Sequence, residues 1–174
     1  MVPAWAEVRA EVGKRCGEYR FAEAAQLLKG EGKPEEAPER AAWLALTESA
    51  ATLFPALEAD LKKGTVDVPL TVKDGGAAFV KASGGTEGHL TVIDATGTAK
   101  EIAWHELSPG SVIDLHRQLV KTAGEEEKLR RHEAAIAFDW LAGDRDRAKI
   151  AGDRLAQDNE AFKRRWEAIS PALK

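Results

Sequence analysis

The spacing of apolar residues changes twice along this chain of 174 residues. Between residues 4 and 62 apolar side chains recur every three or four positions, the period of a helix that buries one face. Between residues 65 and 105 they alternate with polar residues in short runs separated by Gly-rich turns, the period of strands. From residue 108 to the end the helical period returns. Two helical regions around a run of strands predict the α+β class.

Four short strands are predicted in the middle segment. They cover residues 66–72, 77–82, 89–95 and 99–104, with turns at KDGGA, SGGTEG and TGT. Pro69 cannot donate a hydrogen bond to a neighbouring strand, so the first strand is predicted at an edge of the sheet. A segment of this length buries little surface alone. We therefore expect a small four-stranded antiparallel β meander, or a barrel-like insert, packed with the helices.

Helices are predicted on both sides of the strands. Ser108 followed by Pro109 has the sequence of an N-cap and a first helical residue. Pro55 lies inside a long helical pattern and predicts a kink or a break near residues 52–54. Pro3 suits the first turn of the first helix. The predicted helices cover residues 3–15, 20–29, 38–63, 109–123, 125–142, 145–157 and 159–169.

The positions of these elements predict a domain organisation with three segments. Residues 1–64 form an N-terminal helical hairpin region, residues 65–107 form the antiparallel β insert, and residues 108–174 form a C-terminal helical region. Because the strands interrupt two helical halves, we expect the first and third segments to form one compact unit.

Composition and charge exclude several classes of protein. Apolar residues make up 44% of the chain, which is enough for a core and argues against global disorder. The formal net charge is −4, so the chain has no positive field with which to attract nucleic acid or an anionic membrane. Cys16 is the one cysteine, so no intrachain disulfide can form. Its neighbours predict a small residue on a helix face.

The sequence contains no signal for membrane insertion or export. No run of about 18 apolar residues is present, so no transmembrane helix is expected. The first residues carry charges too early for a signal peptide. We expect a cytoplasmic location by default, unless the chain is a domain excised from an exported protein.

One helical pair has Gly17, Tyr19 and Ala22 near its turn, and a second has Leu141, Gly143 and Ala148. Both pairs resemble tetratricopeptide-like hairpins. In that family small residues near the turn let the two helices of a hairpin pack closely. The two copies here are not adjacent, whereas a tetratricopeptide array buries its faces between adjacent copies. The phrase IAWHELSP after the β insert is similar to regions of uncharacterised multidomain bacterial proteins.

Few residue patterns in the chain indicate chemistry. The four histidines do not form an H-x-x-x-H pair and one cysteine is present, so neither a metal site nor a cofactor is expected. His116 and His132 are interpreted as exposed helix residues. The carboxylates of Asp94, Glu101 and Glu106, with His105, would support acid–base catalysis only if buried together. The tryptophans are interpreted as core anchors, with one or two exposed in a binding groove as the alternative: Trp5, Trp43, Trp104, Trp140 and Trp166.

These observations favour a non-catalytic protein–protein interaction or scaffold module of a larger bacterial protein or assembly, with a protein or peptide as its partner. Trp104, His105 and Glu106 are the expected contact residues, because they lie at the junction between the strands and the second helical region. One alternative is a carboxylate-dependent hydrolase. Another is a structural homo-oligomerisation domain that assembles through the sheet edge near Pro69 or through helix faces.

Overall fold

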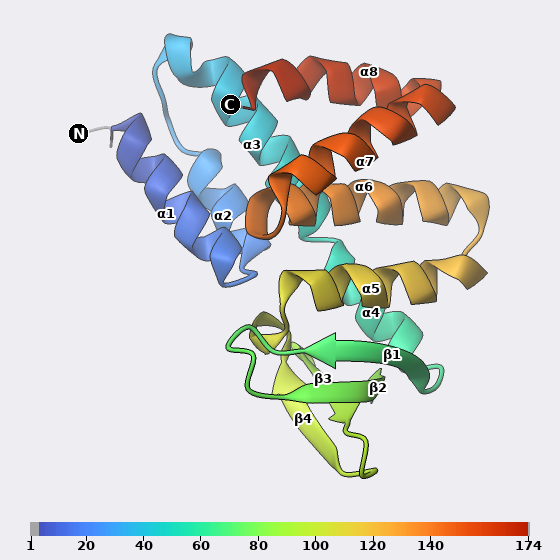
Figure 1. Ribbon diagram of the computed structural model, residues 1–174. Helices are drawn as coiled ribbons and strands as arrows, with labels where there is room; N and C mark the ends of the chain where they lie inside the picture. Colours follow the sequence, from blue (N-terminus) through green and yellow to red (C-terminus); the bar gives the residue numbers. More distant parts are fainter. Residues whose placement is uncertain (1–3, 174) are drawn as a thin grey trace. The chain divides into compact units, whose positions relative to one another are not determined.

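The computed structural model describes residues 4–173 and has the predicted α+β class (Figure 1). The helices are α1 (Trp5–Gly17), α2 (Phe21–Leu28), α3 (Ala37–Ala50), α4 (Leu53–Leu61), α5 (Pro109–Leu119), α6 (Glu125–Ala142), α7 (Arg145–Asp158) and α8 (Glu160–Ile169). The strands are β1 (Val66–Thr71), β2 (Ala78–Gly84), β3 (His89–Ile93) and β4 (Ala99–Ala103). Short 3-10 turns are η1 (Pro34–Glu36), η2 (Trp104–Glu106), η3 (Val120–Thr122) and η4 (Ser170–Ala172).

Most of the predicted helix boundaries agree with these elements. The long helical pattern divides into α3 and α4 just before Pro55, as its position predicted. Ser108 is the N-cap of α5, and its side chain accepts a hydrogen bond from the Ser111 amide. Pro3, expected in the first turn of the first helix, lies outside the described residues.

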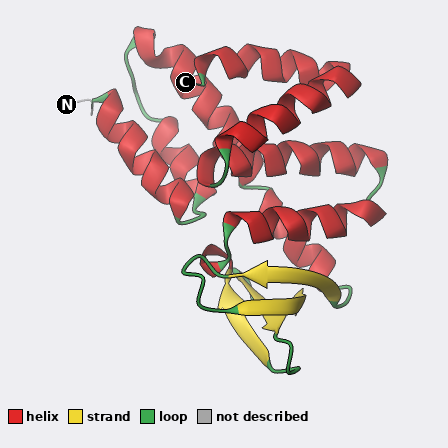
Figure 2. Cartoon of the chain, viewed as in Figure 1, coloured by secondary structure: helices red, strands yellow, loops and turns green. Residues whose placement is uncertain are grey.

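The four strands form one open antiparallel sheet in the order β1-β2-β3-β4 (Figure 2). The meander and the edge position of Pro69 are therefore confirmed, and the barrel-like alternative is wrong. A barrel would require β1 to pair with β4. Instead, the outer edge of β1 bonds to the start of α5: the Ser108 amide donates to the Thr71 carbonyl at 2.9 Å, and the Thr71 amide donates to Ser111 Oγ at 2.8 Å.

The chain divides into two compact units. One contains Met1–Ala51 with Ile136–Lys174 and is called the helical unit; the other contains Thr52–Ala135 and is called the sheet unit. Helix α6 is continuous across the second boundary. The boundaries predicted from the sequence lie at 64/65 and 107/108, whereas the chain passes from one unit to the other at 51/52 and 135/136. The difference arises because α4 and α5 pack on the strands, α4 against β2 and α5 against β1.

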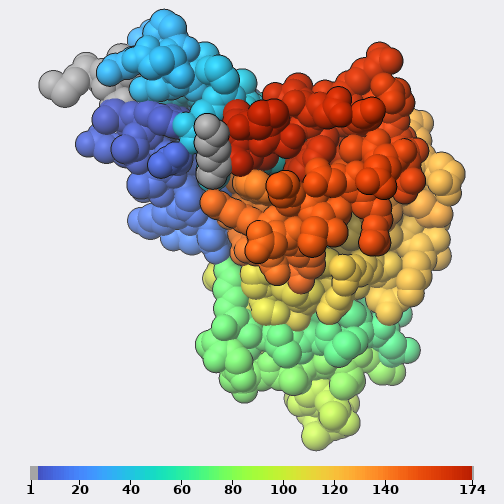
Figure 3. Space-filling model, turned by 45° about the horizontal axis from the view of Figure 1, so that its top comes forward, coloured from blue at the N-terminus to red at the C-terminus, as the bar shows by residue number. Residues whose placement is uncertain are grey.

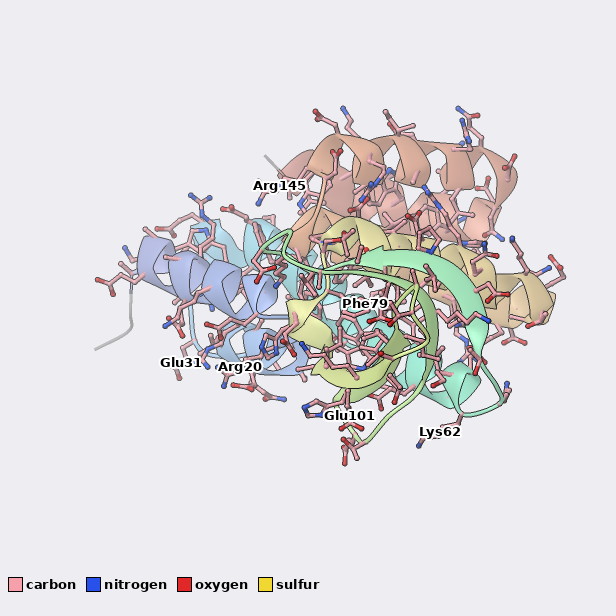
Figure 4. The ribbon with its side chains drawn as sticks, turned by 60° about the horizontal axis from the view of Figure 1, so that its bottom comes forward. Arg20, Glu31, Lys62, Phe79, Glu101 and Arg145 are labelled. Carbon is pink, nitrogen blue, oxygen red and sulfur yellow. The ribbon has the colours of Figure 1, made fainter. Side chains whose placement is uncertain are left out.

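The core of the sheet unit lies between one face of the sheet and these two helices. Alternate strand residues point into it, as expected for a sheet with one face in water. Phe79 on β2 is one of them, whereas Glu101 on β4 is exposed (both labelled in Figure 4). The buried side chains include Val68, Leu70, Phe79, Ala82, Leu90, Val92 and Ile102 from the sheet, Leu53, Phe54, Leu57 and Leu61 from α4, Trp104 and Leu107 after β4, and Val112, Ile113 and Leu115 from α5.

The helical unit consists of packed helices, with α1 against α2, α2 against α3, α7 against α8, and α8 against α3. Figure 3 shows α7 and α8 as neighbours in orange and red. Tyr19 joins α1 to α2 with a left-handed backbone (φ 59°), and its ring packs against Phe138 at 5.0 Å between centroids. Cys16 is fully buried in α1, so its predicted place on a packed helix face is confirmed.

Candidate functional site

The three residues expected to contact a partner form the 3-10 turn η2, but they face different surroundings. Trp104 is buried, its indole Nε1 donates to Glu58 Oε1 at 2.8 Å, and its ring lies 5.0 Å from that of Phe54. His105 and Glu106 are exposed, and the Glu106 carboxylate accepts from the Ala103 amide at 2.7 Å. Trp104 therefore anchors the core of the sheet unit. A binding role for these residues stays a prediction.

The carboxylates that suggested hydrolase chemistry are held separately, each by its own hydrogen bonds. Asp94 Oδ1 accepts from the hydroxyl and amide of Thr96, and these bonds lower the pKa of Asp94. Glu101 accepts from the Thr86 hydroxyl at 2.6 Å, which lowers the pKa of Glu101. Glu106 lies at the far end of β4 from Asp94. A general acid needs a raised pKa, so these hydrogen bonds shift both groups away from that role.

The turn between α6 and α7 is built by a buried carboxylate. Asp139 is 3% exposed and accepts from Nε and Nη2 of Arg147, both at 2.6 Å, and from the Asp144 amide at 3.0 Å. Asp144 in turn caps α7 by accepting from the Arg147 amide. This paired, hydrogen-bonded geometry fixes the first turn of α7.

Arg145, the first residue of α7, lies between two tryptophans in the helical unit. Its guanidinium carbon is 5.9 Å from the ring centroid of Trp43, on α3, and 5.9 Å from that of Trp140, on α6. Its Nε donates to the Trp140 carbonyl at 3.3 Å. The side chain is exposed (labelled in Figure 4), and its two Nη groups make no hydrogen bond or ion pair with the described residues. We call these three residues the Arg145 cluster.

The Arg145 cluster places an exposed cation beside two aromatic rings and a carbonyl. Two aromatic faces and a carbonyl hold the guanidinium, since a cation within about 6 Å of an indole is attracted to the ring. The terminal Nη groups are left for an external acceptor, and a guanidinium binds carboxylates or phosphates through paired hydrogen bonds. Trp43 and Trp140 were predicted as candidates from the sequence, whereas Arg145 was not. Its local signal is its position directly after the Gly143–Asp144 turn.

The sheet unit holds a second polar cluster, which was not predicted from the sequence. His116 was interpreted as an exposed helix residue, and that interpretation is wrong because the residue is 2% exposed. It lies one helical turn after Val112, on the apolar face of α5. His132, which is half-buried, approaches it from α6. Position on the apolar face was the signal that could have found this pair.

Within residues 4–173 no group of three or more His, Cys, Asp or Glu side chains is placed to hold a metal ion. None of the helices in that part of the chain has the length and apolar character required to cross a membrane. Comparison of the chain with models of protein families, with curated proteins and with solved structures finds no match.

Proposed function

We propose that the chain is a non-catalytic protein-interaction module whose helical unit binds an acidic segment of a partner protein. The observation that carries the proposal is Arg145, which is exposed yet held between Trp43 and Trp140. The resemblance noted in the sequence implies the setting, a larger bacterial protein or assembly. The acidic partner follows from the charge of the guanidinium.

Three physical properties suit the Arg145 cluster to this role. Arginine is one of the residue types that dominate binding energy at protein interfaces, and the buried rings of Trp43 and Trp140 support it from below. An arginine that is already held loses less side-chain entropy on binding, a saving of up to about 2 kcal/mol. Arg145 is also the first residue of α7, and the N-terminal end of a helix favours a negative charge nearby.

The experiment that tests this function compares acidic peptides with neutral copies. A display library of peptides rich in Asp and Glu is screened against the full chain, and the best binders are remade with Asn and Gln at the acidic positions. We expect the neutral copies to bind at least about tenfold more weakly, a difference of about 1.4 kcal/mol. A library in which no acidic peptide binds better than its neutral copy would contradict the proposal.

A matched pair of variants separates the held arginine from simple charge. Arg145→Gln and Arg154→Gln each remove one positive charge from α7, and Arg154 is exposed with no ion pair or hydrogen bond to the described residues. We expect Arg145→Gln to weaken peptide binding about tenfold and Arg154→Gln to change it less than twofold. Arg145→Lys should not restore binding, because an ammonium group lacks the planar paired donors. Equal losses in the two Gln variants would show that net charge alone causes the effect.

A further inference from the structure

A hydrogen bond between two histidines joins α5 to α6 in the sheet unit. His116 Nε2 and His132 Nδ1 are 3.2 Å apart, and the two rings meet edge to face with centroids 5.2 Å apart. The remaining ring nitrogen of His116, Nδ1, is buried and has no hydrogen-bond partner in the described residues. The two rings are called the histidine pair.

The burial of His116 fixes where the protons of the pair reside. A buried N–H without an acceptor costs more than a buried lone pair without a donor. We therefore assign the His116 proton to Nε2, from which it donates to His132 Nδ1. Adding a proton to His132 Nδ1 would place two donors against each other. The other tautomer of His116 would bury an Nδ1–H that has no acceptor. Protonation of His132 at Nδ1 thus removes the acceptor of the present hydrogen bond, and protonation of His116 at Nδ1 creates a buried donor without an acceptor.

Positive charge surrounds the histidine pair. Arg131 on α6 is 5% exposed, and its Nη1 donates to Asp60 Oδ2 on α4 at 2.5 Å. Its Nε and Nη2 are buried and have no acceptor in the described residues. Asp60 is shared with Lys63, which lies 3.0 Å away. The cluster therefore already holds more positive than negative charge, and a protonated histidine would add to the excess.

Most carboxylates on the packed elements have partners of their own, and the charged side chains that lower the pKa values of the two rings are those of Arg117, Lys128 and Arg131. Asp114 pairs with Arg117 at 3.3 Å, Glu125 with Lys128 at 3.0 Å, and Glu127 with Arg130. Glu58 accepts from the Trp104 indole and the Gly88 amide. The charged groups on the elements next to the pair are Asp114 and Arg117 on α5, Glu58 and Asp60 on α4, Asp67 on β1, Lys121 on η3, and Glu125, Glu126, Glu127, Lys128, Arg130, Arg131 and Glu133 on α6.

We propose that the histidine pair is an acid-sensitive latch: proton uptake at mildly acidic pH breaks the bond between His116 and His132 and releases the first half of α6 from α5. The latch is independent of the peptide-binding role, since it lies in the sheet unit. In the closed latch both rings are neutral, and one donates a hydrogen bond to the other. When it opens, both rings reach water and take up protons.

The pKa shifts agree in sign with this latch. Burial, followed by the neighbouring positive charges, lowers the pKa of His116 to about 3, and burial also lowers the pKa of His132. Each folded pKa is below the ordinary value near 6.5, so protons bind more tightly to the open state. The closed state is fully favoured above about pH 6.5 and loses stability as pH falls from there toward 3. At pH 5 the lowered pKa of His116 alone raises the opening equilibrium about 30-fold.

Hydrogen exchange of the full chain tests the latch. Amide protection is measured at pH 7.5 and pH 5.0, corrected for the intrinsic pH dependence of exchange, in peptides covering residues 109–119 and 125–135. We expect protection in these segments to fall about 30-fold or more at pH 5.0. Residues 5–28 of the helical unit serve as the internal reference, because all four histidines lie in the sheet unit. Equal loss in the reference segment would overturn the latch.

Two double variants identify the groups responsible. His116→Leu with His132→Gln should abolish the loss of protection at pH 5.0. His89→Gln with His105→Gln, which removes the same number of histidine rings, should leave it unchanged. Loss of the effect in the second double variant would overturn the proposal. NMR titration of the wild-type rings decides the question if the first variant fails to fold: a His116 ring that titrates near pH 6.5 with protection intact would also overturn it.

Discussion

At the residue scale, the packing of α7 on α8 depends on Gly152, which has a hydrogen atom where other residues have a Cβ. A Cβ at this position would lie 2.5 Å from Cζ2 of Trp166 on α8. The indole cannot move aside easily, because its Nε1 donates to Asp153 at 2.8 Å and its ring stacks on Phe162 with centroids 5.8 Å apart. The close approach of α7 and α8 therefore depends on the missing side chain.

Gly152→Ala should lower the free energy of unfolding by about 1–3 kcal/mol, because the added methyl group overpacks this contact. Gly13→Ala is the control: it lies in α1 with open space around its Cα, and alanine there should raise stability by up to about 1 kcal/mol. Urea denaturation followed by circular dichroism measures both. A Gly152→Ala chain as stable as the wild type would mean that α8 can shift without cost.

Residue-level prediction from sequence failed where the partners are distant in the chain. Nothing near Arg145 in the sequence indicates Trp43, which belongs to another helix about a hundred positions earlier, so the Arg145 cluster has no local pattern. The same holds for Glu58, whose partner is the indole of Trp104. By contrast, the burial of His116 could have been predicted from the sequence, because His116 follows Val112 by one helical turn.

At the scale of elements, α5 is held to β1 by the hydroxyl groups at its first turn. Ser108 Oγ accepts from the Ser111 amide at 3.3 Å and lies 3.0 Å from Thr71 Oγ1. Ser111 Oγ also accepts from the Thr71 amide, which is an edge donor of the sheet. The same groups thus begin a helix and cover a strand edge.

Ser108→Ala should cost about 1 kcal/mol through loss of the N-cap, with a further loss where the hydroxyl network meets β1. Ser83→Ala on β2, a half-buried serine without a side-chain hydrogen bond among the described residues, should change stability by less than about 0.5 kcal/mol. Thermal unfolding of the two variants provides the comparison. Equal effects would show that the cap contributes nothing specific.

Elements were predicted well because their signals are local. Pro69 placed β1 at an edge, Ser108 marked the start of α5, and Pro55 divided α3 from α4. Closure of the sheet was a different kind of question. Whether the sheet closes depends on which group bonds to the free edge of β1. In this structure that group is Ser111, forty positions beyond Thr71. Strand patterns do not contain that information.

At the scale of the whole molecule, Cys16 reports on the integrity of the helical unit. It is fully buried in α1, and burial raises the pKa of its thiol to about 12. At pH 8 about one thiol in ten thousand would be ionised, and only the thiolate reacts with a disulfide reagent. Labelling should therefore require opening of the helical unit.

We expect Ellman's reagent to label native Cys16 at least about a hundredfold more slowly than the urea-unfolded chain. The control is Ala6→Cys in a Cys16→Ala background, since Ala6 is exposed on the same helix and should react at the rate of a free thiol. Fast labelling of Cys16 in the native chain would contradict the burial of this face of α1.

The interruption of the helical unit by the sheet unit affects the order of events on the ribosome. Helices α1 to α3 are synthesised first, but α8, which packs on α3, is translated only after the whole sheet unit. At an elongation rate of about 5–20 residues per second this delay is on the order of ten seconds. The nascent chain can complete the later-made sheet unit while the face of α3 still lacks its cover. An early exposed helix face of this kind is where a ribosome-associated chaperone would be needed.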